Sequence, residues 1–165
     1  MYRDGVHDLV LHDAQVVRER ALETLNYIID QRTGYLGNLV PNTIAASSDG
    51  KDLTSRRAVM MLEKLFKEST SLTGEKTIKG MDAMFKYQSL NQDFIRELPF
   101  EPLYSVLVAS SNSDRVVKIV LDALAKQFAS SHEVLSSFTE RSPSRVPIVS
   151  FYFYVLRPIS LMFTV

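Results

Sequence analysis

RERALETLNYI, at residues 18–28, is a helical phrase that recurs in outline as SRRAVMMLEKLF at 55–66 and as SDRVVKIVLDALAKQF at 113–128. In each copy, basic residues precede a small or branched apolar residue, and leucines follow at helical spacing; the matched positions are Ala21, Leu22 and Leu25, then Ala58, Val59 and Leu62, then Val120, Leu121 and Leu124. A helix of this kind has one wide apolar face. Its recurrence predicts stacked helical repeats, in which each unit buries its apolar face against the next.

The copies are unevenly spaced. Ala21 and Ala58 lie 37 positions apart, which is near the period of about 40–47 residues of armadillo and HEAT units. Ala58 and Val120 lie 62 positions apart, so this interval requires either an inserted helix of about 20 residues or a degenerate unit centred on residues 81–90. A plain helical bundle is the competing architecture, because three matches to a loose apolar pattern also fit ordinary amphipathic helices.

Chain breakers and apolar periodicity divide the rest of the chain. The segment 47–51, SSDGK, is a loop by composition, and Pro41 restricts the helix before it to a short one with an irregular start. The periodicity predicts helices over 6–17 continuing into 18–31, and over 35–46, 52–69, 77–90, 92–98, 101–109, 114–128 and 132–138. The predicted fold class is all-α, of the armadillo/HEAT-like stacked-repeat type, followed by an irregular hydrophobic C-terminal tail.

Composition places the chain among globular proteins. Its 165 residues suffice for one ordinary domain, and 45% hydrophobic with 23% charged residues do not describe a disordered chain. The formal net charge is zero, which does not favour a nucleic-acid binder. Cysteine is absent, so disulfides, thiolate zinc sites and a cysteine nucleophile are excluded. Acidic residues near Met1 do not fit a secretory signal, so we do not expect secretion.

Residues 141–165 differ in character from the domain that we expect over 1–140. All 19 acidic residues lie at or before Glu140, and three arginines lie after it. The run VPIVSFYFYVLRPISLMFTV at 146–165 is apolar and aromatic, but the charge of Arg157 in its middle does not favour a membrane span. Three interpretations stay open: a tail that is not native to the repeat fold, a buried closing element, and membrane contact.

No catalytic, cofactor or metal signature stands out. His7 and His12 are five positions apart, so they do not converge on one metal as residues four apart on a helix would. His132 follows two serines, but adjacent residues rarely meet in triad geometry, and no G-x-S-x-G elbow is present. The segment 71–77, SLTGEKT, lacks the earlier glycine of a phosphate loop. We therefore expect no enzyme, no cofactor and no metal.

Basic residues mark the start of each copy of the phrase. If the copies stack, these side chains occupy equivalent positions and form a row that could receive an acidic peptide or a nucleic-acid backbone. The alternative is that each is solvated or pairs with a neighbouring acid, such as Glu19, Asp52 or Asp114. The candidate partner-binding row comprises Arg18, Arg20, Arg56, Arg57, Arg115 and Lys118.

Three segments carry a resemblance to a known family: RERALETLNYI, SSDGKDLTSRRAVMMLEKLF and DFIRELPFEPLYSVLVASSNSDRVVKIVLDAL. Within the armadillo/HEAT-like superfamily, residues 18–128 resemble the armadillo-like region of the large ARID-bearing subunit of PBAF-type SWI/SNF chromatin remodellers. The chain has no ARID module, the part of that subunit that would touch DNA. The resemblance implies a nuclear chromatin-remodelling complex whose other subunits are the protein partners.

The function that we expect is a non-enzymatic protein–protein interaction scaffold, in which a curved stack presents apolar grooves and polar rows to a partner helix or peptide. Two other classes compete with it. One is a nucleic-acid-binding helical protein of nucleocapsid type that uses the arginine row, and the other is a tail-anchored membrane adaptor. Membrane contact is the less favoured, and a location outside the nucleus would be cytoplasmic.

Overall fold

The computed structural model describes residues 2–31, 37–68, 75–90 and 100–109, and the shorter stretches 115, 118–120, 122–123 and 126. The chain divides into two compact units, Met1–Ala125 and Lys126–Val165. The helices discussed below belong to the first unit. The domain boundary expected at Glu140, the hydrophobic tail and the helices expected over 92–98 and 132–138 lie outside the described residues.

Helices account for nearly all of the four long described stretches, which contain no strand. In chain order they are α1 (Tyr2–Asp8), the 3-10 helix η1 (Leu9–Leu11), α2 (Gln15–Asp30), α3 (Val40–Ser47), α4 (Asp52–Glu68), α5 (Glu75–Leu90) and α6 (Glu101–Ala109). The segment SSDGK separates α3 from α4, as its composition predicts. Pro41 lies in the first turn of α3, where proline is tolerated because the first amides of a helix have no acceptor within it.

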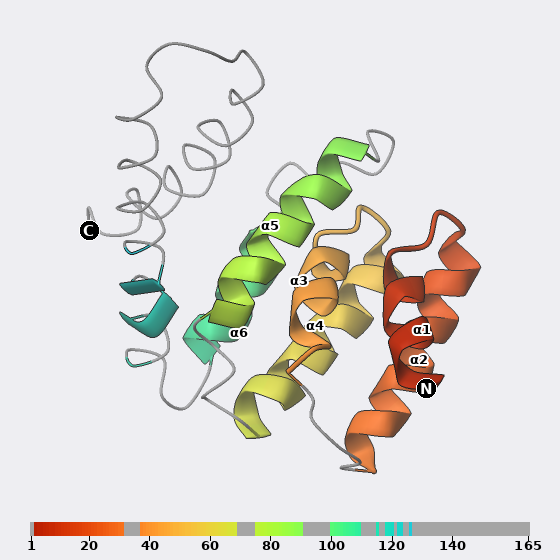
Figure 1. Ribbon diagram of the computed structural model, residues 1–165, viewed down its shortest axis with the longest axis horizontal. Helices are drawn as coiled ribbons and strands as arrows, with labels where there is room; N and C mark the ends of the chain where they lie inside the picture. Colours follow the sequence, from red (N-terminus) through yellow and green to blue (C-terminus); the bar gives the residue numbers. More distant parts are fainter. Residues whose placement is uncertain are drawn as a thin grey trace. The chain divides into compact units, whose positions relative to one another are not determined.

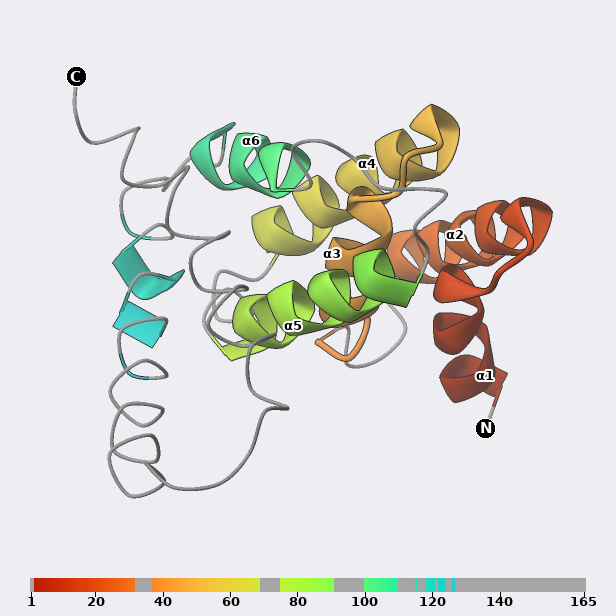
Figure 2. The same ribbon diagram turned by 90° about the horizontal axis from the view of Figure 1, so that it is seen from above.

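The helices of the first unit form two layers (Figure 1). Figure 2 shows α2, α4 and α6 in one row, and α1, α3 and α5 in the other. Neighbours pack within each row, α2 on α4, α4 on α6 and α3 on α5, and α3 also packs across onto α4. The described helices of the first unit therefore form a two-layered stack, and the predicted all-α fold of stacked helical repeats is confirmed.

The first two copies of the recurring phrase occupy equivalent places in this stack. They form α2 and α4, which run parallel, because contacts join residue 19 to residue 57 and residue 26 to residue 64. The 62-residue interval before the third copy contains α5 and α6. The described part of this interval thus contains two helices, and the degenerate unit around residues 81–90 stays a prediction. Most of the third copy lies outside the described residues, although Val120 is helical and buried.

The core lies between the two layers and contains the leucines of the phrase. The side chains of Leu22, Leu25 and Leu62 are almost completely inaccessible to solvent, and Ala21 and Ala58 are buried beside them. Burying one such leucine contributes about 1.5–3 kcal/mol relative to leaving it exposed. The apolar face that the sequence predicts is therefore the face that joins the layers.

Gly80 allows α3 and α5 to approach closely. A Cβ atom added at Gly80 would lie 2.5 Å from Cδ1 and 2.8 Å from Cβ of Ile44, whose side chain is fully buried. Distances this short are inside van der Waals contact, so any larger residue would push the two helices apart.

One predicted helix is wrong. The periodicity over 6–17 predicts a helix that continues into the phrase, but the chain leaves the helical conformation at His12, where φ is −64° and ψ is 147°. The backbone carbonyls of His12 and Asp13 accept hydrogen bonds from Nη1 of Arg18, at 2.8 and 2.7 Å. Nδ1 of His12 accepts a hydrogen bond from the amide of Ala14. Side chains thus take over bonds that a continuous helix would make in its backbone.

Candidate partner-binding surface

The structure removes Arg18 from the candidate row. Its side chain is 1% exposed, and its Nε donates a hydrogen bond to Oδ2 of Asp49 at 2.8 Å. A row that receives a partner needs exposed guanidinium groups, so the prediction is wrong for this residue. Arg18 instead joins α2 to the loop between α3 and α4, the helix pair that follows α2 in the chain.

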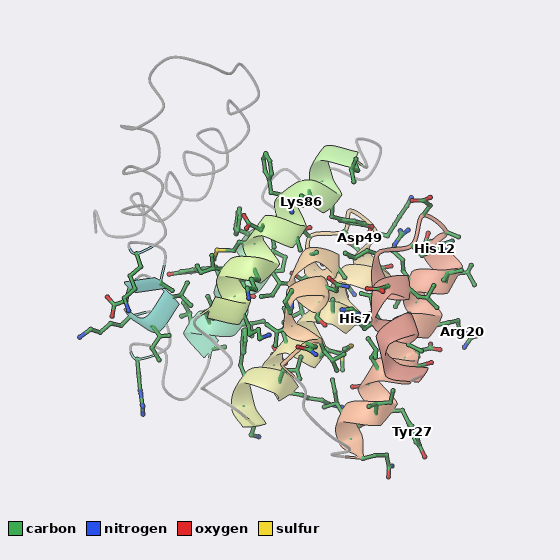
Figure 3. All side chains as sticks on the ribbon, in the orientation of Figure 1. His7, His12, Arg20, Tyr27, Asp49 and Lys86 are labelled. Carbon is green, nitrogen blue, oxygen red and sulfur yellow. The ribbon has the colours of Figure 1, made fainter. Side chains whose placement is uncertain are left out.

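Asp49 is the centre of a buried polar cluster, which we call the Asp49 junction (Figure 3). Besides Arg18, its carboxylate accepts hydrogen bonds from the Tyr87 hydroxyl at 3.1 Å and from the Lys51 backbone amide at 2.8 Å. Burial, and then the charge of Asp49, raise the pKa of Tyr87 above its ordinary value, so that the phenol remains a donor. One carboxylate therefore bonds to side chains from α2 and α5 and to the loop that precedes α4.

Further hydrogen bonds fix the loop on either side of Asp49. Oγ of Ser55 donates to the carbonyl of Ser47 at 2.6 Å, and Nε2 of Gln88 donates to the carbonyl of Ser48 at 2.6 Å. Ser47, Ser48 and Asp49 are fully buried, which is unusual for a connecting segment because its polar backbone must find partners away from water. The junction gives the stack a rigid centre.

Arg20 and Arg56 are the exposed members of the row. Each side chain is 78% exposed. Nη1 of Arg20 contacts Oε2 of Glu23 at 2.8 Å on the same helix, and Nη2 of Arg56 lies 3.9 Å from Oδ2 of Asp52. Exposed pairs of this kind contribute little to stability, so both guanidinium groups remain accessible to a partner.

Arg57 belongs to a line of ion pairs between α2 and α4, which we call the α2–α4 ladder. Nη2 of Arg57 contacts Oε1 of Glu23 at 2.8 Å, and Nη1 lies 3.7 Å from Oε2 of Glu19. Two turns further along, Nζ of Lys64 donates to Oδ1 of Asn26 and to Oδ1 of Asp30, both at 2.8 Å. The hydrogen bond from Arg20, helped by the charge of Arg57, holds the pKa of Glu23 below its ordinary value.

Exposed apolar side chains lie on the same outer face as Arg20 and Arg56. Sequence reasoning missed them, although their positions on the helices, opposite the buried leucines, are the signal that could have found them. Val16 is 70% exposed, Tyr27 66% and Met60 60%. In Figure 3, Arg20 and Tyr27 project away from the stack. The outer face, defined by its apolar residues, comprises Val16 and Tyr27 on α2, Leu53 and Met60 on α4, and Tyr104 and Val108 on α6.

Apart from Arg18, the partner-binding row stays a prediction. The structure brings Arg20, Arg56 and Arg57 together on α2 and α4. Arg115 and Lys118 are exposed, but the helix around them lies mostly outside the described residues, so their place in the row stays a prediction.

The histidines that the sequence singled out hold local structure. His12 accepts the amide hydrogen bond already described, and Nδ1 of His7 lies 3.0 Å from Oδ1 of Asp8. Within the described ranges, no group of three histidine or acidic side chains could hold a metal ion. His132 lies outside these ranges. None of the helices in the described part of the chain is long and apolar enough to cross a membrane.

Residues 1–162 match the model of the Nipped-B_C family, described as sister chromatid cohesion C-terminus. The match covers nearly the whole chain and continues past Glu140 into the hydrophobic tail. The chain therefore belongs to this family, whose members are HEAT/armadillo-like helical repeats. No curated protein and no solved structure matches the chain.

Proposed function

We propose that this member of the sister chromatid cohesion C-terminus family is a non-enzymatic scaffold that holds protein partners inside a larger chromatin-associated assembly. The observation that carries the proposal is the outer face of α2, α4 and α6, where exposed apolar side chains lie beside Arg20 and Arg56. Aromatic residues, methionine and arginine are enriched in protein interfaces, where a few of them carry most of the binding free energy.

The stack behind this face supplies rigidity. The Asp49 junction and the α2–α4 ladder fix α2 against α4, so the backbone that carries the exposed side chains needs little ordering when a partner binds. Less ordering means less conformational entropy lost on association, which favours binding. Arg57 supports the face from the ladder, and Arg115 and Lys118 would extend it toward a later repeat.

The family description supports a nuclear location and a role in sister chromatid cohesion. A finer proposal comes from the sequence resemblance, which suggests a subunit or part of a chromatin-remodelling complex of PBAF type. The two differ in the proteins that should accompany the chain, so one experiment distinguishes them.

The experiment is capture from nuclear extract with the full chain as bait, followed by quantitative mass spectrometry. Cohesion proteins among the retained partners would support the family role, and remodeller subunits would support the finer proposal. The test variant is Tyr27→Ser/Met60→Ser, and the matched control is Leu9→Ser, which changes an exposed apolar side chain on η1 away from the outer face.

We expect the double variant to lose at least about tenfold of the specific partners, because central interface residues each contribute more than about 1 kcal/mol, while the control retains them. Equal capture by both variants would overturn the outer face as the binding site. Retention of nucleic acid alone, lost between about 50 and 200 mM salt, would instead support the nucleic-acid-binding rival.

A further inference from the structure

Exposed charges on α4 are arranged symmetrically about the middle of the helix. Five exposed residues at spacings of four, four, three and four positions share one side of it. They are Asp52, Arg56, Met60, Glu63 and Lys67, and we call them the α4 stripe. Asp52 and Lys67 lie equally far from the middle, at opposite ends. Arg56 and Glu63 do the same closer in, so each acid has a base as its counterpart. Both pairs are centred between positions 59 and 60, beside Met60.

The outer side of α2 has the same symmetry. Val16 and Tyr27 are exposed apolar residues whose centre lies between positions 21 and 22. Arg20 and Glu23 share this centre, and they again match a base with an acid. We call these four residues the α2 stripe. On both helices, therefore, apolar residues are matched with apolar ones, and acids with bases, across one central point.

The centres of the two stripes lie close together because of the register between α2 and α4, which lie side by side in one row (Figure 2). Nζ of Lys64 contacts Asn26 and Asp30, which are 38 and 34 positions earlier, so Lys64 is level with a point about 36 positions before it. The centres are then about two residues, or about 3 Å, apart along the helices. This distance is shorter than an arginine side chain, so a single two-fold axis can cross both stripes.

We propose that the two stripes bind a second copy of this chain in an antiparallel orientation, with α4 on α4 and α2 on α2. In this dimer, Arg56 of each copy meets Glu63 of the other, and the two Met60 side chains meet beside the axis. The remaining counterparts of the stripes meet in the same reciprocal way. A two-fold interface requires this kind of surface, because residue i contacts residue j and j contacts i.

The charges select the antiparallel orientation. In a parallel dimer each charged residue of the α4 stripe would face its own equivalent, and like charges placed opposite each other are repelled. Within one copy, Arg56 lies 3.9 Å from Asp52 and Arg20 lies 2.8 Å from Glu23, and such exposed pairs contribute little. Docking exchanges these pairs for equivalent pairs between copies, so no charge loses a partner.

The apolar residues supply the affinity. Met60 lies at the centre, where a flexible and polarisable side chain adapts to its own equivalent. Val16 and Tyr27 meet on α2, and aromatic residues and methionine are enriched in protein interfaces. Contacts of this kind exclude water around the exchanged ion pairs, which fix the register.

A ligand with charges of one sign fits these stripes less well. Each stripe has as many acids as bases, so a nucleic-acid backbone or an acidic peptide would meet repulsion at every acid. A second copy carries the matching pattern of both signs. The proposal rests on the proposed function, because it names the protein partner that the outer face holds.

The test is sedimentation equilibrium of the full chain from about 10 to about 500 µM, a range that covers weak, transient association. Arg56→Glu and Glu63→Arg each replace two attractive contacts of the dimer by two repulsive ones. The double variant Arg56→Glu/Glu63→Arg restores opposite charges across the interface. An equimolar mixture of the two single variants does so too, because the new acid of one faces the new base of the other.

We expect a concentration-dependent dimer whose dissociation constant rises at least about tenfold in each single variant and returns to within about threefold in the double variant and in the mixture. Positions 56 and 63 are about 10.5 Å apart along one helix, so contact within one chain does not explain such a rescue. Lys79→Glu, an exposed charge reversal on α5, is the control and should leave the dimer unchanged. Thermal melts verify that each variant is folded.

Three results would overturn the proposal: a chain that stays monomeric over the whole range, association that neither single variant weakens, and a mixture that fails to recover it. The capture experiment separates this failure from that of the proposed function. A monomeric chain whose Tyr27→Ser/Met60→Ser variant still loses its captured partners would overturn the dimer alone. Equal capture by that variant and its control would overturn the outer face as a binding site.

Discussion

Two parts of the molecule join neighbouring repeats with the same chemistry in opposite surroundings. In the Asp49 junction, Nε of Arg18 lies 2.8 Å from Oδ2 of Asp49, and the two side chains are 1% and 0% exposed. In the α2–α4 ladder, Nζ of Lys64 lies 2.8 Å from Oδ1 of Asp30, and these side chains are 39% and 50% exposed. The two distances are equal, so the length of the contact does not distinguish the pairs; burial does, together with the further hydrogen bonds that Arg18 and Asp49 make.

Burial changes what is lost when a pair is broken. Water screens the exposed pair, and when one partner is removed the other returns to full hydration, so the median exposed pair contributes about 0–1 kcal/mol. Inside the junction, removing one partner leaves a charge with no water to solvate it. We therefore expect the Asp49 junction to contribute more than the α2–α4 ladder to the free energy that holds neighbouring repeats together.

The sharpest way to break the comparison is Asp49→Ala. Because Arg18 would keep its charge in a buried site, we expect a loss of about 3–5 kcal/mol in the free energy of unfolding, measured by urea denaturation. The double variant Asp49→Ala/Arg18→Met removes both charges and should recover much of this loss. A loss below about 1 kcal/mol in the free energy of unfolding of Asp49→Ala would show that the buried pair contributes no more to stability than an exposed one.

Leu62→Ala measures how much a buried apolar side chain contributes to the free energy of unfolding, for comparison with the buried ion pair. Leu62 is fully buried on α4, so the substitution leaves a cavity and should cost about 2–5 kcal/mol in denaturant unfolding. Met60→Ala, at an exposed position of the same helix, is the control and should cost far less. If Leu62→Ala cost less than about 0.5 kcal/mol, the leucines of the phrase would not form the repeat core.

Gly80→Ala tests the close apolar packing of α5 against α3. The added Cβ would lie 2.5 Å from Cδ1 of Ile44, so we expect a loss of about 1–3 kcal/mol from overpacking. The companion variant Gly80→Ala/Ile44→Val shortens the opposing side chain and should recover part of the loss. A rise in the thermal midpoint of Gly80→Ala would mean that helix propensity outweighs the close approach.

The sequence predicted the parts of the fold that depend on local periodicity. The spacing of Leu22, Leu25 and Leu62 identified the buried face of α2 and α4, because helix periodicity and burial follow the same register. The loop SSDGK was also predicted, since its residues are those of turns. The burial of its first three residues, Ser47, Ser48 and Asp49, was not predicted, because composition indicates a turn but not which helices cover it.

The candidate site was predicted less well, because its residues depend on distant partners. An arginine near the start of a helix has the same local pattern whether it is solvated, as Arg20 is, or buried, as Arg18 is. Arg18 is buried because it pairs with the carboxylate of Asp49, which is 31 positions away in the sequence. The break at His12 went unpredicted for the same reason, since no glycine or proline marks it and the bonds from Arg18 create it.

The smallest expected effect comes from the ladder itself. Lys64→Ala removes the contacts to Asn26 and Asp30 and should lower the free energy of unfolding by only about 0.2–1 kcal/mol. That loss should shrink when unfolding is repeated at about 1 M salt, where the screening length falls to about 3 Å, whereas the loss in Asp49→Ala should change little. Lys67→Ala, one turn further along α4, controls for helix propensity. A Lys64→Ala loss that equals the Asp49→Ala loss and resists salt would mean that distance, and not burial, governs how ion pairs hold these repeats together.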